Sequence, residues 1–270
     1  MKTLGKTSAN LITQLFEENK TFFTIGDIIR INNTNFNAAK KLISDLAKRK
    51  IIARLKGGKY LIIPQELGNI DKYIGNWYIA TREVINSPDY YIAFYSAMHH
   101  WGMLTQPITK VLVATPKRQF VSKEMKDKLI IIFVNKKFVW GIKEDWVTKT
   151  EKIRFSDLEK TIIDCLAYPK HCGGITEIAK GIWISKDKID YIKLCDYADK
   201  YDKNVVAKRL GYVLEILKIN QPVVKERFKK YIKDRYDLFD PTLPKQILNK
   251  NNWRLIDNVG EKTILNLIKY

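Results

Sequence analysis

Small polar and basic side chains gather near the N-terminus, in a pattern suited to binding nucleic acid. Asparagine can read the edge of an adenine, lysine can contact guanine or a phosphate, and serine can contact either a base or a phosphate. The candidate contact residues are Thr34, Asn35, Asn37, Lys40, Lys41, Ser44, Lys48, Arg54, Lys56, Gly57, Gly58 and Lys59. This set offers hydrogen bonds to base edges and ion pairs with phosphates, which is the chemistry of binding.

Three helices are expected to position the first part of this set. Apolar residues within 4–19 share one helical stripe, which predicts a first helix. Thr24 is expected to cap a short helix over 25–31, which Asn32 and Asn33 end. Thr34 then opens a longer helix. Its expected inward face holds Phe36, Ala39, Leu42, Ile43 and Leu46, and its outward face Asn37, Lys40, Lys41, Ser44 and Lys48.

A two-stranded hairpin is expected to position the rest. Residues 51–55 and 60–63 are typical of strands, and Gly57 and Gly58 favour a tight turn between them because glycine adopts positive φ at little cost. The order of helix, short helix, turn, longer helix and hairpin is that of a winged helix-turn-helix, whose helix after the turn enters the DNA major groove. Winged helices also serve as protein–protein modules, but that use needs no basic face.

The charge of the chain agrees with a polyanionic partner. The 270 residues carry a formal net charge of +19, which favours nucleic acid or an anionic membrane surface as the partner. Residues 1–66 are the most basic part for their length, with 12 basic and five acidic residues. The length favours two domains, and a hydrophobic share of 46% is typical of globular proteins.

The composition also argues against several classes of protein. Three cysteines cannot build a disulfide framework, and no stretch has the roughly 18 uncharged apolar residues of a membrane span. The N-terminus lacks the apolar core of a signal peptide, so a cytoplasmic location is expected. Because no P-loop, dinucleotide-binding fingerprint or nucleophile elbow occurs, we expect no enzymatic activity and no cofactor.

The remainder of the chain predicts a mixed α+β domain. We expect a winged helix-turn-helix over 1–66 and a larger domain over 67–270, with a mixed part to residue 155 and a mostly helical part after it. A capping box formed by Ser156 and Glu159 should start the latter part. Helices are expected over 77–85, 90–102, 158–168, 175–181, 188–200, 204–219, 223–233 and 263–268, and strands over 111–115, 129–134, 138–142 and 253–256.

Two groups of possible metal ligands have simpler structural explanations. His99 and His100 are adjacent, so on a helix they point about 100° apart, whereas helical ligand pairs need a spacing of three or four. Cys165, His171 and Cys172 lack a fourth ligand and a paired cysteine spacing. We therefore expect structural roles for all five and no metal site.

Charged groups in the second domain are also given structural roles. Asp157, Glu159 and Asp164 share one helix. The expected capping box explains Glu159, and Asp157 lies favourably at the positive end of the helix. The basic run over 225–235 is interpreted as a solvated helix face, with an additional DNA or RNA contact as the alternative.

Several stretches together resemble one known family over nearly the whole chain. They are the N-terminal module, Tyr90 to Thr105 with the strand 111–115, Phe155 to Leu166 with Pro169 and Gly173-Gly174, and Asp237 to Pro241 with Trp253. In these features the chain resembles the AbiEi family of antitoxin-type transcriptional regulators, from type IV (abortive infection) toxin–antitoxin systems. None of the motifs is catalytic.

The resemblance implies a repressor that binds its own promoter, often at inverted repeats, through the winged helix. It also implies a C-terminal antitoxin domain that counteracts a nucleotidyltransferase toxin without a stable complex. We further expect a monomer or weak dimer. From this resemblance only the DNA-binding role is assigned to individual residues, namely those of the expected helix after the turn and of the hairpin. Two alternatives stay open: a ligand-responsive regulator with an effector pocket beneath the Tyr90–Trp101 helix, and an enzyme targeted by its winged helix.

Overall fold

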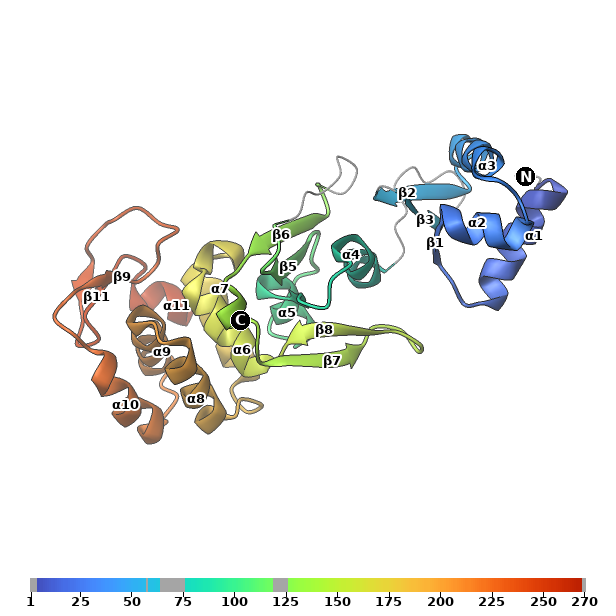
Figure 1. Cartoon of the computed structure of the whole chain (residues 1–270). Helices are drawn as coiled ribbons and strands as arrows, with labels where there is room; N and C mark the ends of the chain where they lie inside the picture. The colour runs from blue at the N-terminus through green and yellow to red at the C-terminus, as the bar shows by residue number, and fades with distance from the viewer. Residues whose placement is uncertain (1–3, 57, 64–75, 119–125, 269–270) are drawn as a thin grey trace. The chain divides into compact units, whose positions relative to one another are not determined.

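The computed structural model describes residues 4–56, 58–63, 76–118 and 126–268, and its fold is α+β. Contacts divide the chain into two compact units (Figure 1). Unit 1 falls within Met1–Pro88, Gln119–Leu129 and Val147–Glu151, and unit 2 within Asp89–Arg118, Ile130–Trp146 and Lys152–Tyr270. The domain boundary expected between residues 66 and 67 lies outside the described residues.

Unit 1 combines helices with a small antiparallel sheet of strand order β1–β3–β2. The expected helices and hairpin are confirmed, whereas the short strand β1 was not anticipated. Gly58 has a φ of 79° between β2 and β3, a conformation that glycine adopts without strain. The elements are α1 (Lys6–Glu17), β1 (Phe22–Thr24), α2 (Ile25–Asn32), α3 (Phe36–Lys48), β2 (Ile52–Lys56), β3 (Lys59–Ile62) and α4 (Trp77–Ile85).

One apolar cluster joins α1, α2 and α3 to this sheet. Leu11, Ile28 and Leu46, one from each helix, are fully buried. Burial of each such side chain contributes roughly 1.5–3 kcal/mol, so the spacing of apolar residues fixes which face of each helix points inward. Phe36 was expected on the inward face of α3, but it is 57% exposed because it begins the helix and lies outside the buried cluster.

Thr24 caps α2 as expected, and Asp27 completes a capping box that was not anticipated. The Thr24 hydroxyl accepts a hydrogen bond from the Asp27 amide at 3.3 Å, and the Thr24 amide donates to the Asp27 carboxylate at 2.8 Å. We expect Thr24→Ala to lower the stability of α2 by about 1 kcal/mol, because alanine cannot accept that bond. Amide hydrogen exchange in α2 measures this effect. Thr13→Ala, at an exposed position inside α1, is the control and should leave exchange in α2 unchanged.

Unit 2 contains most of a five-stranded sheet of order β6–β5–β4–β8–β7. The central strand β4 pairs antiparallel with β5 and parallel with β8, and β7 and β8 form an antiparallel hairpin. Tyr91 and Ile92, which make up β4, are fully buried. The strands are β4 (Tyr91–Ile92), β5 (Val111–Thr115), β6 (Leu129–Phe133), β7 (Ile142–Trp146) and β8 (Lys152–Ser156).

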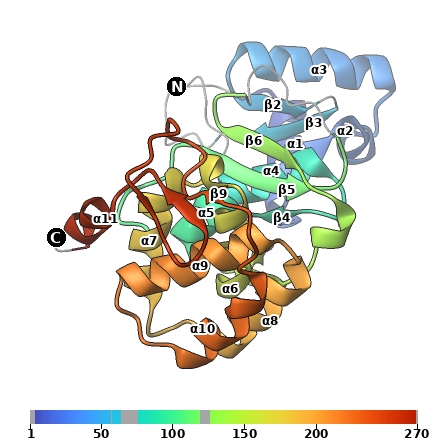
Figure 2. The ribbon, with the colours of Figure 1, turned by 90° about the vertical axis from the view of Figure 1, so that its left-hand side faces the viewer.

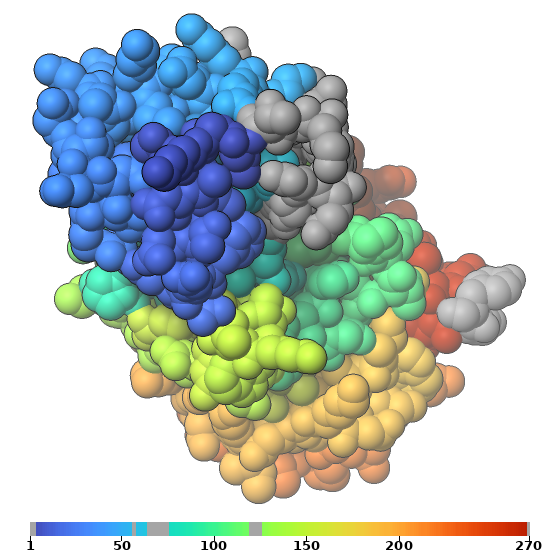
Figure 3. Space-filling model, turned by 90° about the vertical axis from the view of Figure 1, so that its right-hand side faces the viewer, coloured from blue at the N-terminus to red at the C-terminus, as the bar shows by residue number. Residues whose placement is uncertain are grey.

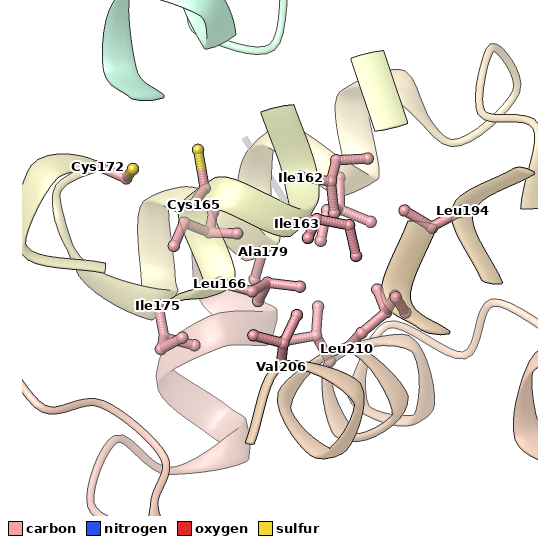
Figure 4. Close-up of a cluster of buried hydrophobic side chains, with 14 of the residues drawn as sticks. Ile162, Ile163, Cys165, Leu166, Cys172, Ile175, Ala179, Leu194, Val206 and Leu210 are labelled. Carbon is pink, nitrogen blue, oxygen red and sulfur yellow. The ribbon is translucent and has the colours of Figure 1, made fainter. Parts of the chain in front are cut away.

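Helices form the rest of unit 2 (Figure 2). Ile163 and Leu166 of α6 meet Leu194 of α8 and Leu210 of α9 in the middle of the apolar core (Figure 4). The helices are α5 (Phe94–His100), α6 (Leu158–Ala167), η3 (Pro169–His171), α7 (Gly174–Ser185), α8 (Tyr191–Tyr201), α9 (Asn204–Ile216), α10 (Pro222–Phe228), η4 (Lys229–Tyr231) and α11 (Glu261–Leu267). A small sheet of order β10–β11–β9 completes the unit, with β9 (Asp237–Leu238), β10 (Asn249–Lys250) and β11 (Leu255–Asp257).

Three local expectations in unit 2 were wrong. The helix expected over 90–102 is split into β4 and the shorter α5, since a short apolar run suits a buried strand as well as a helix. The strand expected over 138–142 begins only at Ile142, as β7, because the 3₁₀ turn η2 (Lys136–Phe138), which the Asn135 side chain caps, occupies the chain before it. Asp157 caps α6 in place of Ser156, whose hydroxyl bonds the Thr161 hydroxyl at 2.7 Å.

The effector pocket considered beneath the helix over 90–101 is filled by packed side chains. Phe94 and Met98 of α5 are fully buried. Opposite them, a Cβ atom on Gly181 of α7 would lie 2.9 Å from Met98 Cε and 3.2 Å from Met103 Cβ. Because these groups already touch closely, the space under α5 forms part of the core.

Candidate nucleic-acid interface

The exposed face of α3 brings together five of the polar residues predicted to bind nucleic acid. Ala39, Ile43 and Leu46 are buried on the other face and hold the helix to the rest of unit 1. Successive residues turn by about 100°, so a polar set at steps of three and four shares the outward face. Asn37, Lys40, Lys41, Ser44 and Lys48 are all exposed there.

The start of α3 differs from the expected cap. Asn35, and not Thr34, is the N-cap, and its side-chain oxygen accepts a hydrogen bond from the Ala38 amide at 2.9 Å. The Thr34 amide donates to the Ile29 carbonyl at 3.2 Å, and its side chain is half-buried. The exposed Asn35 therefore already uses its side-chain oxygen to cap α3. The next residue, Phe36, is also exposed.

Residues of the hairpin occupy different positions. Arg54 is exposed on β2, and a Cβ atom built on the exposed Gly58 would meet no atom within 4 Å. Lys59 instead turns to α4, where its ammonium contacts the Glu83 carboxylate at 2.9 Å and donates to the Glu83 carbonyl at 3.1 Å. The Lys56 side chain and Gly57 lie outside the described residues.

Charge compensation separates α3 from the neighbouring helices. Glu18 contacts Lys20 at 3.0 Å and Arg30 at 2.7 Å. Hydrogen bonds from Arg30 and Lys20 lower the pKa of the Glu18 carboxyl. Lys40, Lys41 and Lys48, by contrast, make no ion pair with any described residue, and together they outnumber the exposed Asp45 of the same helix, so this surface of α3 keeps a net positive charge. Figure 3 shows the atoms of α1, in dark blue, beside those of the following helices of unit 1 in lighter blue.

The basic run of unit 2 is largely compensated by acidic neighbours. Arg227 contacts Asp196 at 2.6 Å and Asp199 at 2.8 Å, and Lys230 contacts Asp199 at 3.0 Å. Lys229 pairs with Glu226 in the same way. Since these ion pairs lie at the surface, the interpretation of the run as a solvated face agrees with the structure better than a second polyanion site does.

The carboxylates of α6 take up structural contacts. Asp157 caps the helix, and Glu159 accepts a hydrogen bond from the Asp190 amide at 3.0 Å at the start of α8. Asp164 is buried with Lys160. No group of three or more histidine, cysteine, aspartate or glutamate side chains suited to a metal occurs in the part of the chain that the structure describes.

The two adjacent histidines point to different environments. His100 stacks on Phe155 with ring centroids 3.7 Å apart, and its Nε2 lies 3.0 Å from the Asp145 carboxylate. His99 is exposed. Their divergence follows from their adjacent positions on α5.

Two half-buried histidines, His100 and His171, should make the stability of unit 2 depend on pH. Burial lowers the pKa of His100, with the Asp145 carboxylate opposing this, and burial also lowers the pKa of His171. Both rings bind a proton more weakly when folded, so their contribution to stability is present above about pH 6.5 and is lost as the pH falls below that value. The variant His100→Gln/His171→Gln should therefore lose less melting temperature than the wild type between about pH 7 and about pH 5.

Comparison with known proteins identifies a shared fold. No protein-family model matches the chain, and no curated protein matches its sequence. The crystal structure of the RV2827C protein from Mycobacterium tuberculosis is similar, with a TM-score of 0.76 over 99% of this chain and 96% of that chain, at 13% sequence identity. At this identity the likeness shows the fold alone and establishes no activity. No helix within the described ranges is long and apolar enough to cross a bilayer.

Two features of the interface were missed by sequence reasoning. Phe36 was assigned to the core, although its position directly after an Asn cap was a signal that it begins the helix. The Lys59–Glu83 contact joins residues 24 positions apart, and no local pattern indicates it. The structure thus centres the candidate interface on α3 and assigns Lys59 an internal ion pair.

Proposed function

We propose that the protein is a sequence-specific DNA-binding transcriptional repressor in which α2, α3 and the β2–β3 hairpin act as a winged helix-turn-helix. The observation that carries this proposal is the outward face of α3, where Lys40, Lys41 and Lys48 are exposed without an ion pair to any described residue, opposite the face that buries Ala39, Ile43 and Leu46. A helix that presents such a face can lie in the major groove.

The side chains of α3 divide into two roles under this proposal. Lys40, Lys41 and Lys48 neutralise phosphates or read guanine, and Asn37 and Ser44 lie between them with hydrogen-bonding groups for base edges. The exposed Phe36 adds an apolar surface that suits the methyl group of thymine. Arg54 and the turn at Gly58 provide a further contact to the backbone of the duplex.

We further propose that the repressor is the cytoplasmic antitoxin of a type IV toxin–antitoxin system. It would repress its own operon and counteract a nucleotidyltransferase toxin without a stable complex. The support for this part is the resemblance to the AbiEi family over nearly the whole chain, with the larger unit 2 as the antitoxin portion and no catalytic role for the chain.

Binding to duplex DNA from the region upstream of its own gene tests the first part. Fluorescence anisotropy should give a higher affinity for that duplex than for an unrelated duplex of the same length. The logarithm of the binding constant should fall linearly with the logarithm of the salt concentration, because neutralised phosphates release counterions. Equal affinity for both duplexes would remove sequence specificity, and an affinity independent of salt would remove the phosphate contacts.

The antitoxin part has a separate test. Co-expression with a nucleotidyltransferase encoded beside the gene should restore growth that the nucleotidyltransferase alone arrests. Failure of this rescue with normal DNA binding would leave a repressor without antitoxin activity. Rescue by a variant that no longer binds DNA would place the antitoxin activity outside α3.

A further inference from the structure

An apolar groove opens on unit 2 where α7, α8, α9 and α11 approach one another. It encloses about 640 Å³ and is called the α7–α11 groove below. Its apolar lining comes from Trp183, Leu217, Ile219, Leu265 and Ile268. Helix α11 lies beside α7 in both ribbon views (Figures 1 and 2) and packs against α7 and α9, so it forms one side of the groove.

Two lysines give this groove a positive rim. Lys186 and Lys218 both line it, and neither makes an ion pair with any residue that the structure describes. The Lys186 ammonium lies 3.7 Å from the centre of the Trp183 ring, so the ring face holds this cation beside the apolar floor. Asp187 is the single carboxylate among the lining residues and is exposed, which leaves an excess of positive charge.

The volume, the apolar lining and the positive rim together indicate which kind of molecule suits the groove. The volume is within the range of about 300–1,000 Å³ typical of small-molecule sites, which join an apolar lining to a few polar groups. The charged sugar-phosphate backbone of a nucleic-acid duplex would leave the apolar floor without a partner. A second copy of the chain would bring another net charge of +19 against the same positive rim. A small molecule with an apolar body and one negative group satisfies both the floor and the lysines.

We propose that the α7–α11 groove binds a small anionic amphiphile, meaning a carboxylate that carries an apolar chain or ring. The chain or ring lies on Leu265 and Ile268, and the carboxylate pairs with Lys186 and Lys218. This site is independent of the DNA-binding face of α3, so it holds whether or not the proposed repressor function is correct.

Octanoate is a suitable probe for this site, with 1-octanol as the uncharged molecule of equal chain length. Isothermal titration of the full chain without DNA should show saturable binding of octanoate and weaker binding of 1-octanol. Lys186→Gln and Lys218→Gln should each weaken octanoate binding by about two- to fivefold at low salt, as expected for one exposed ion pair. Lys188→Gln, at an exposed position outside the groove, is the matched control and should leave the affinity unchanged.

A second pair of variants tests the floor. Leu265→Glu and Ile268→Glu place a negative charge in the apolar lining and should abolish octanoate binding, while circular dichroism checks that the fold persists. If either variant unfolds, the lysine variants still decide the question. Absence of saturable binding to the wild type, equal binding of 1-octanol, or equal loss in Lys188→Gln would each overturn the proposal.

Discussion

The double substitution Lys40→Ala/Lys41→Ala is expected to weaken binding to the proposed operator about ten- to hundredfold at about 0.1 M salt. Both side chains are exposed on α3 and make no ion pair with any described carboxylate, so both ammonium groups are available to a phosphate. The slope of log affinity against log salt should become shallower by about two, because two fewer counterions are released. Fluorescence anisotropy over a salt series measures both quantities.

A control of equal charge separates this effect from a general loss of attraction. Lys245→Ala/Lys262→Ala removes the same two positive charges from exposed positions in unit 2. It should change the affinity far less, since contact with phosphates depends on position as well as on net charge. Circular dichroism should show the same helix content in both variants. If both double variants lost the same affinity, the assigned face of α3 would not be the contact surface.

The N-terminal helices could be predicted because their apolar residues recur at the helical spacing of three and four. In α3, Ala39, Ile43 and Leu46 are buried as expected, and the polar set between them is exposed. Thr24 could be recognised as a cap because it precedes an apolar run and is followed by Asp27 three residues later. These signals depend only on residues close together in the chain, so they can be recognised without knowledge of the fold.

Other features depend on contacts between distant parts of the chain. Tyr91 and Ile92 form the middle of a sheet only because β5 and β8 flank them, and an apolar dipeptide next to a helix carries no sign of this. From the sequence, Lys59 was expected to contact DNA. In the fold, Glu83 of α4 lies beside Lys59 and forms an ion pair with its ammonium group. The face of α3 was therefore predictable, whereas the role of the hairpin lysine required the fold.

A buried ion pair in unit 2 leads to the largest expected effect on stability. Lys160 and Asp164 lie one turn apart on α6, both almost without solvent exposure, and are in direct contact. The Tyr91 hydroxyl donates to the Asp164 carboxylate at 3.1 Å, and the Lys160 ammonium lies 4.8 Å from the centre of the Trp140 ring. Burial raises the pKa of Asp164, although the ammonium and the hydroxyl oppose this.

Asp164→Ala should therefore lower the free energy of unfolding by about 3–5 kcal/mol, because it leaves the Lys160 ammonium buried without a counter-charge. Urea unfolding followed by tryptophan fluorescence reports this change, since five of the six tryptophans lie in unit 2. Asp234→Ala, at an exposed position, is the control and should change the free energy by less than about 0.5 kcal/mol.

The double variant Lys160→Met/Asp164→Leu distinguishes the value of the pair from the cost of breaking it. Two apolar side chains of similar size remove both buried charges, so much of the stability lost in Asp164→Ala should return. Recovery would show that the single variant is destabilised by an uncompensated charge. If the double variant were as unstable as Asp164→Ala, the hydrogen bond with Tyr91 and the surrounding aromatic rings would instead hold the pair as a unit that apolar packing cannot replace.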